Sequence, residues 1–127
     1  MEDLVRYFLN QKRIAVVGSF RNETKYAYRI FKTLKEKGYE VFPVNRRSGE
    51  IEGIKSYARI EDIPENIDAV SIITPPQVTI NIVKDCKDKE VRIVWFQPGA
   101  EDKEAIDFCK QNGISVIHGL CLMLEAV

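Results

Sequence analysis

Five short apolar runs, each close to a glycine or a proline-containing turn, constrain the fold of this 127-residue sequence more than any other feature. Each run is continuous rather than alternating and is rich in β-branched residues. This pattern is typical of strands that are buried on both faces of a parallel sheet. The runs occupy residues 14–17, 41–44, 69–73, 91–96 and 114–117.

Amphipathic stretches separate these runs. Their apolar residues recur every three or four positions, which predicts helices with one buried face. Alternating strands and helices with short links predict an α/β fold with a parallel sheet covered on both sides. We therefore expect residues 1–127 to form a single Rossmann-like three-layer domain with a mostly parallel sheet of five to six strands. The helical stretches are residues 2–10, 27–34, 78–86 and 105–109.

The segment from residue 49 to residue 64 breaks the alternation. It contains two glycines and only scattered apolar residues. We interpret it as a loop with one short edge strand near residues 55–57 and a helical turn at residues 60–63.

Composition excludes several classes of protein. Nineteen Lys and Arg residues balance nineteen Asp and Glu residues, whereas nucleic-acid binders usually show a basic excess, so no nucleic-acid partner is expected. No apolar run exceeds six residues, against about 20 for a membrane span. The N-terminus lacks the basic and apolar regions of a signal peptide. The three cysteines are widely spaced, which predicts free thiols in a reducing cytoplasm rather than disulfides or a zinc site.

The sequence shows no arrangement that indicates catalysis. There is one histidine, His118, without an acidic partner nearby in sequence, and we interpret it as structural or solvent-exposed. No Walker loop, metal-binding cluster or nucleophile with an adjacent base is visible. We therefore expect a protein that is not an enzyme, and nothing in the sequence identifies a protein partner.

Candidate binding residues follow from the sheet. In open parallel α/β sheets, ligands bind beyond the carboxyl ends of the strands, near the point where the strand order reverses. The residues directly after the apolar runs are therefore the candidates. A lysine near the start of the helical stretch at residues 27–34 and a cysteine after the last run are added to them. They are Gly18, Ser19, Phe20, Arg21, Lys25, Asn45, Arg46, Arg47, Thr74, Pro75, Pro76, Gln97, Pro98, Gly99 and Cys121.

Gly18 allows a sharp turn after the first run, and the helix that follows would present its N-terminal N–H groups to a phosphate. Lys25 would add a positive charge there. The three-glycine fingerprint of dinucleotide-binding folds is absent. The alternative is a simple tight turn and a solvated lysine.

Arg46 and Arg47 occupy the position after the second run, where NAD-binding folds place an acid that binds the ribose 2′-hydroxyl. Guanidinium groups instead bind phosphate. This favours a ligand with a phosphorylated ribose, either coenzyme A with its 3′-phosphate or NADP with its 2′-phosphate. A solvent-exposed basic loop is the alternative.

Two turns contain proline. Pro75 and Pro76 form either a stiff apolar ledge for an adenine ring or a pantetheine arm, or the first turn of a helix. Residues 97–99 form a rigid turn that exposes backbone groups. Cys121 is interpreted either as buried packing or as a thiol within reach of a ligand thiol.

Four motifs in order, IAVVGS, KGYEVFPVN, TPP and VWFQPGAE, resemble the stand-alone CoA-binding domain family. That family is similar to the N-terminal CoA-binding domain of the succinyl-CoA ligase alpha subunit. The resemblance extends from about residue 11 to residue 124. It implies that coenzyme A lies across the carboxyl edge of the sheet. The positions that match the family's binding segments are Gly18, Ser19, Phe20, Arg21, Asn45, Arg46, Thr74, Pro75, Pro76, Gln97, Pro98, Gly99 and Cys121. The sequence departs from the family pattern at Arg46, where many members have proline. The residue that contacts the ligand phosphate is therefore expected to be either Arg46 or Arg47.

The resemblance implies binding of coenzyme A or an acyl-CoA without catalysis, because the phosphorylated histidine of the ligase lies in a later domain. Two other functions remain open at this point. One is an NADP-linked enzyme or redox sensor, and the other is an interaction domain with a vestigial nucleotide site.

Overall fold

Five parallel strands form the central sheet of the computed structural model, which describes residues 1–47 and 49–126. Their spatial order is β2-β1-β5-β6-β7. The predicted parallel sheet is confirmed, with five strands that are all parallel. The strands are β1 (Arg13–Gly18), β2 (Glu40–Val44), β5 (Ala69–Ile73), β6 (Ile93–Phe96) and β7 (Ser115–Ile117).

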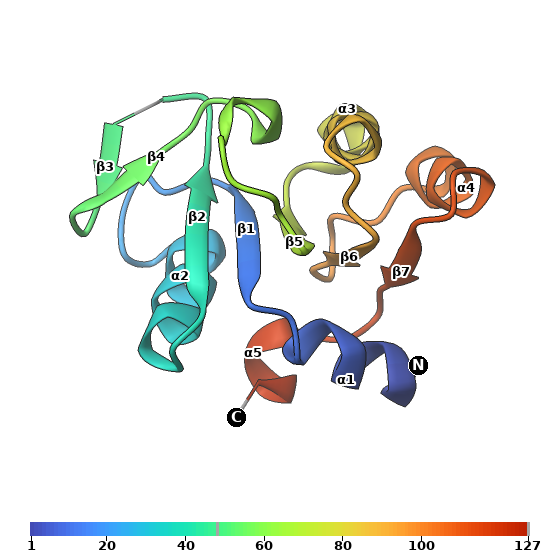
Figure 1. The fold of residues 1–127 in the computed structure, drawn as a ribbon, viewed down its shortest axis with the longest axis horizontal. Helices are drawn as coiled ribbons and strands as arrows, with labels where there is room; N and C mark the ends of the chain where they lie inside the picture. Colours follow the sequence, from blue (N-terminus) through green and yellow to red (C-terminus); the bar gives the residue numbers. More distant parts are fainter. Residues whose placement is uncertain (48, 127) are drawn as a thin grey trace.

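Helices cover both faces of this sheet, which confirms the three-layer α/β architecture (Figure 1). On one face lie α1 (Glu2–Leu9), α2 (Tyr26–Glu36) and the short α5 (Leu122–Glu125). On the other face lie α3 (Pro76–Asp88) and α4 (Lys103–Gln111). None of the described helices is long and apolar enough to cross a membrane.

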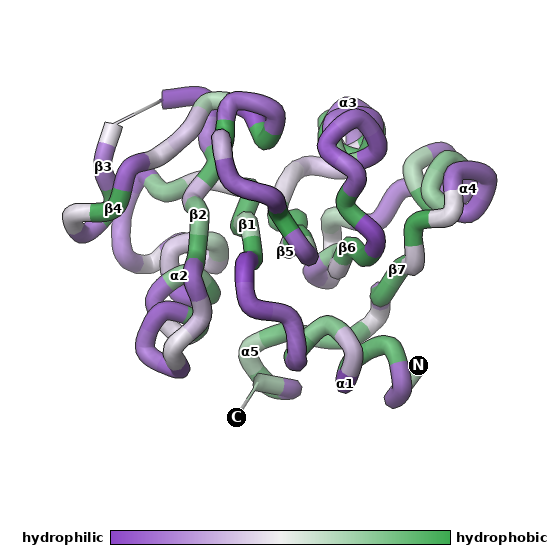
Figure 2. The backbone as a smooth tube through the Cα atoms, viewed as in Figure 1, coloured by the Kyte–Doolittle hydropathy of each residue, from purple (hydrophilic) through white to green (hydrophobic). Residues whose placement is uncertain are grey.

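Alternation of side chains along each strand supplies both apolar layers. In β1, Ile14 and Val16 pack on the face of α1, α2 and α5, whereas Ala15 and Val17 pack on the face of α3 and α4. Because both faces are covered, every one of these side chains is buried, which explains the continuous apolar runs. The strands accordingly form the hydrophobic centre of the molecule in Figure 2.

The segment after β2 differs from the sequence interpretation. The short strand predicted near residues 55–57 exists as β4 (Ile54–Ser56), but it pairs with β3 (Gly49–Ile51) in a separate antiparallel hairpin. Among the described residues, one isolated β-bridge, between Val44 and Tyr57, connects this segment to the main sheet. The prediction of a plain edge strand was therefore incomplete. The helical turn is confirmed as a 3₁₀ turn at Ile60–Asp62.

Candidate functional site

The strand order reverses at β1. From β1 the chain passes through α2 to β2 on one side, and later reaches β5 on the other side. Ligands of open α/β sheets bind at this point, beyond the carboxyl ends of the strands. The backbone register places Gly18 next to Ile73, at the ends of β1 and β5. The five candidate segments therefore share one edge of the sheet.

Gly18 is required by close packing. A Cβ atom at this position would lie 2.7 Å from the carbonyl oxygen of Ile73 and 2.8 Å from the Cβ of Ala27. Both distances are shorter than real Cβ contacts, and neither neighbour can rotate away because one is backbone and the other is a Cβ. The absence of a side chain thus lets the start of α2 approach the ends of β1 and β5.

The N-terminus of α2 lies at this edge and has the properties of an anion site. Lys25 is its N-cap residue, and no described side chain caps the helix N–H groups. The first turn also contains no acidic residue. The preceding loop is ordered by Asn22, whose Oδ1 accepts the N–H of Thr24 at 2.9 Å. Helix N-terminal N–H groups and the positive end of the dipole together favour phosphate.

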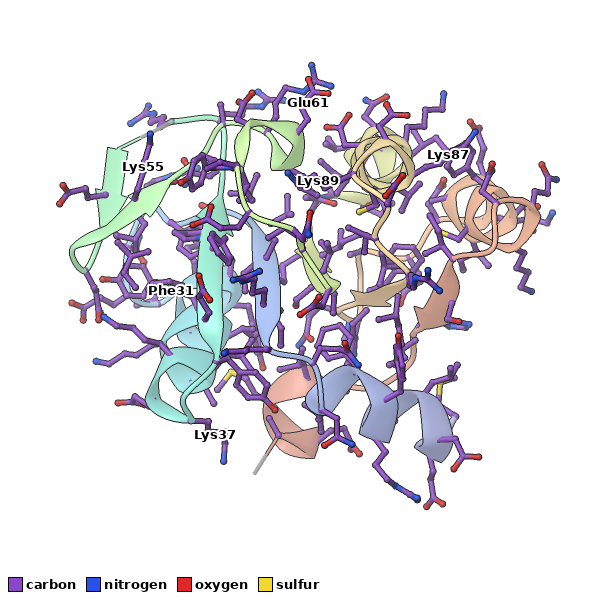
Figure 3. All side chains as sticks on the ribbon, viewed as in Figure 1. Phe31, Lys37, Lys55, Glu61, Lys87 and Lys89 are labelled. Carbon is purple, nitrogen blue, oxygen red and sulfur yellow. The ribbon has the colours of Figure 1, made fainter. Side chains whose placement is uncertain are left out.

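Phe20 contributes to packing rather than to an exposed binding surface. Its side chain is only 8% exposed, and its ring lies 5.8 Å from that of Phe31, centroid to centroid. Phe31 belongs to α2 and lies between that helix and the sheet (Figure 3). The neighbouring Ser19 and Arg21 are exposed. Phe20 therefore anchors the loop, while Arg21 borders a shallow depression with Asn22, Glu23, Thr24 and Tyr28.

Arg46 and Arg47 follow β2, beside the end of β1, and both are exposed. Within residues 1–47 and 49–126, neither guanidinium forms a salt bridge. Asn45 uses its side chain inside the protein: Oδ1 accepts the N–H of Arg47 at 2.8 Å, and Nδ2 donates to Oγ of Ser56 at 2.7 Å. The two arginines are thus on an ordered turn at the candidate edge.

Pro75 and Pro76 begin a helix, which was one of the two sequence interpretations. Pro75 is the N-cap residue of α3 and Pro76 its first residue, and both are exposed. Behind them, Oγ1 of Thr79 lies 2.8 Å from Oγ1 of Thr74 and donates to the carbonyl oxygen of Ala100 at 2.8 Å. This buried hydroxyl joins the ends of β5 and β6.

Residues 97–100 form a β-turn, which is closed by the N–H of Ala100 donating to the carbonyl oxygen of Gln97 at 2.8 Å. Pro98 and Gly99 are the central residues, and Gly99 has a φ of 98°, as a type II turn requires. The Gln97 side chain is only 5% exposed. Its Oε1 accepts the N–H of Leu122 and its Nε2 donates to Sγ of Cys121. Gln97 therefore fixes the C-terminal segment, and the exposed part of this turn is Pro98 and Gly99.

The three cysteines are free thiols, as the sequence predicted. Burial raises the pKa of Cys109 to about 11 and that of Cys86 well above its ordinary range. Cys121 is only partly buried and lies after β7 at the candidate edge. It is the most accessible thiol of the three. His118 is exposed in the same loop.

Sequence reasoning missed the residues that support this edge. Asn22, Ser56 and Thr79 hold its loops by hydrogen bonds. The spacing of Asn22 and Thr24 is a signal for a local side-chain turn and was available in the sequence. The contacts of Ser56 and Thr79 join segments that are 11 and 21 residues apart, and no local pattern indicates them.

The sequence of this chain is similar to those of several known proteins. A family model described as "CoA binding domain" matches residues 12–126. The chain is 31% identical to the alpha subunit of ADP-forming acetate–CoA ligase II from Pyrococcus furiosus, over 94% of this chain and 28% of that subunit. It therefore spans less than a third of that relative. It is also 29% identical to the uncharacterized protein YneT of Bacillus subtilis, over 87% of this chain and 82% of YneT.

Solved structures share the fold along nearly the whole chain. A hypothetical protein from Pyrococcus horikoshii superposes with a TM-score of 0.93 at 32% identity, covering 98% of this chain and 89% of the other. A conserved hypothetical protein from Pyrococcus furiosus gives a TM-score of 0.85 at 37% identity, covering 91% and 99%. The chain is thus similar both to small separate proteins and to one part of larger ligases.

Proposed function

The chain belongs to the CoA-binding domain family, and from this premise we propose that it binds coenzyme A or an acyl-CoA along the carboxyl edge of its sheet, without catalysing a reaction itself. NADP is the alternative ligand, because its 2′-phosphate would satisfy the same arginines.

The observation that carries the proposal is the pair Arg46 and Arg47. Both follow the strand next to the switch point, and neither is paired with a carboxylate in the described chain. A guanidinium group binds phosphate through two parallel hydrogen bonds, and these are stronger than bonds between neutral groups. The pair therefore suits a ribose that carries a phosphate, which distinguishes coenzyme A from its 3′-dephospho form.

The donor set at the adjacent helix fits the rest of the ligand. The uncapped N-terminus of α2, with Lys25 at its N-cap and Arg21 in the preceding loop, suits the pyrophosphate. The exposed surface of Pro75 and Pro76 would then support the adenine or the pantetheine arm. The arm would continue toward Pro98, with Cys121 beyond it.

A binding role without catalysis is proposed on chemical grounds. Most groups at this edge are guanidinium, lysine, backbone N–H and proline, which bind and orient a phosphorylated ligand. Cys121 and His118 lie in the loop after β7, and we assign them no catalytic role. The relatives named as ligases are much longer than this chain, which corresponds to 28% of the Pyrococcus furiosus subunit. Their activity is therefore not assigned to it.

Isothermal titration with coenzyme A, 3′-dephospho-coenzyme A and NADP tests the proposal. Loss of a charge-assisted phosphate contact costs about 1.5–3 kcal/mol, so coenzyme A should bind roughly 10- to 150-fold more tightly than its dephospho form. Tighter binding of NADP than of coenzyme A would favour the alternative. Absence of binding by all three would support a vestigial nucleotide site and refute the proposal.

Variants assign the effect to the arginines. Arg46→Gln and Arg47→Gln should each be compared with Arg92→Gln, a matched control at an exposed arginine that precedes β6 at the opposite edge of the sheet. At least one of the first two variants should lose most of the preference for coenzyme A over its dephospho form. The control should keep it. An unchanged preference in both arginine variants would contradict the proposed phosphate contact.

A further inference from the structure

The hydrogen bonds of Asn45 suggest a role that differs from direct ligand contact. We propose that Asn45 is a positioning residue that fastens the Arg46–Arg47 turn to the β3–β4 hairpin and thereby sets the selectivity for a phosphorylated ribose. The inference rests on the proposed binding of coenzyme A and names what orients the arginines.

The orientation of the Asn45 amide is fixed by its partners. The Arg47 N–H can only donate, so the atom that faces it at 2.8 Å must be the amide oxygen. The amide nitrogen then faces Oγ of Ser56 at 2.7 Å, and that hydroxyl can accept. One side chain thus shapes the arginine turn and also connects it to β4.

The hairpin side of this connection is buried, and Tyr57, the residue after β4, forms two backbone hydrogen bonds at the end of β2. Ser56 is only 1% exposed. The Asn45 N–H donates to the carbonyl oxygen of Tyr57 at 2.9 Å, and the Tyr57 N–H donates to that of Pro43 at 3.0 Å. Removal of the Asn45 amide would therefore leave a buried serine hydroxyl without this partner, although the backbone contacts would remain.

The far end of the hairpin is fastened to α2. The turn consists of Glu52 and Gly53, both with positive φ, as in a two-residue type I′ hairpin. The Tyr28 hydroxyl donates to Oε2 of Glu52 at 3.0 Å, and Lys35 Nζ lies 3.9 Å from Oε1. The hairpin is thus held at both ends, to α2 by its turn and to the arginine turn by Asn45.

This arrangement explains how two exposed arginines can select a ligand. Long exposed side chains lose conformational freedom when they bind, which opposes binding. Ordering of the loop that carries these side chains also opposes binding, and a backbone turn that is already fixed removes this part of the cost for the phosphate contact. It does not alter contacts with the rest of the ligand, so its loss should weaken binding of coenzyme A more than binding of its dephospho form.

Three variants separate the two bonds of Asn45. Asn45→Ala removes both bonds. Asn45→Ser keeps an oxygen that can accept the Arg47 N–H but is too short to reach Ser56. Ser56→Ala removes only the connection to the hairpin. Ser115→Ala, at an exposed serine of β7, is the matched control.

The measured quantity is the ratio of the Kd of 3′-dephospho-coenzyme A to that of coenzyme A, obtained by isothermal titration. Irreversible loss of folded protein changes the apparent stoichiometry, and reversible unfolding lowers the apparent affinity for both ligands by the same factor. The ratio of the two Kd values is therefore insensitive to a global loss of stability. Asn45→Ala should lower this Kd ratio at least about fivefold, and Asn45→Ser and Ser56→Ala should each lower it at least about threefold. These decreases are smaller than the loss of the whole phosphate contact, which corresponds to a ratio of roughly 10 to 150. Ser115→Ala should leave the ratio unchanged.

The outcomes distinguish this inference from the proposed function. If the unaltered protein does not discriminate between the two ligands, the proposed function fails. If it discriminates, and Arg46→Gln or Arg47→Gln abolishes the preference while Asn45→Ala and Ser56→Ala retain the full ratio, the arginines are confirmed and the positioning role of Asn45 is refuted.

Discussion

Replacement of Gly18 by alanine should impair stability and ligand binding together, because this residue sets the distance between α2 and the sheet. The added Cβ would meet the Ile73 carbonyl oxygen at 2.7 Å and the Ala27 Cβ at 2.8 Å. Neither atom belongs to a flexible side chain, so the start of α2 must move away from β1 and β5. Overpacking of this kind costs about 1–3 kcal/mol of the free energy of unfolding.

The same movement should displace the N-terminal N–H groups of α2 from the proposed pyrophosphate position. We expect the Kd for coenzyme A to rise at least about fivefold, which corresponds to about 1 kcal/mol. Urea denaturation measures the first effect and isothermal titration the second.

Gly38→Ala is the matched control for this prediction. Gly38 follows α2, has a φ of 97° and is surrounded by open space, so alanine there is strained only by its backbone conformation. It should lose about 1–2 kcal/mol of stability yet bind coenzyme A as the unaltered protein does. A Gly18→Ala variant that loses less than about 0.5 kcal/mol, the range of ordinary surface substitutions, and binds normally would refute the packing argument.

Two further predictions concern buried groups. Thr79→Val should lower the free energy of unfolding by about 1–3 kcal/mol in urea denaturation, because it removes the hydroxyl that bonds to Thr74 and to the buried carbonyl of Ala100. Thr33→Val in α2 is the control, and equal losses in both variants would contradict this reasoning. The free energy of unfolding should also decrease between about pH 8.5 and about pH 11. A cysteine in the unfolded chain ionises near pH 8.5, whereas burial raises the pKa of Cys109 in the folded protein to about 11, so the folded thiol keeps its proton over this range. Cys109→Ala should flatten this decrease in denaturation curves recorded across that range, and an unchanged slope would refute it.

The layers of the fold could be predicted from sequence because burial on both faces leaves a local signature. Continuous β-branched runs identify the strands, and the alternation with amphipathic helices identifies the architecture. The β3–β4 hairpin was only half predicted. Its sequence signal is a pair of isoleucines, Ile51 and Ile54, on either side of the turn residues Glu52 and Gly53. This signal is weak because glutamate is an uncommon residue at positive φ.

The sequence predicted which residues lie at the candidate site, but it did not predict which of their side chains are exposed to a ligand and which are used in packing. Parallel strands bring their carboxyl ends to one edge, so the residues that follow each strand must meet there. Whether a side chain at that edge faces outward depends on packing between distant segments. Phe20 is buried against Phe31, and Gln97 bonds to the C-terminal segment, whereas Arg46 and Arg47 remain exposed. The sequence alone does not distinguish the buried side chains of this edge from the exposed ones.

Mapping of backbone amide shifts during titration of the isotopically labelled protein with coenzyme A tests the central claim most directly. The account predicts that the shifts concentrate at residues 18–26, 45–47, 74–79 and 97–100, at the carboxyl edge of the sheet. Amides at the opposite edge, such as those of Lys12 and Arg92, should not move. Shifts confined to that opposite edge or to the surface between α3 and α4 would contradict it.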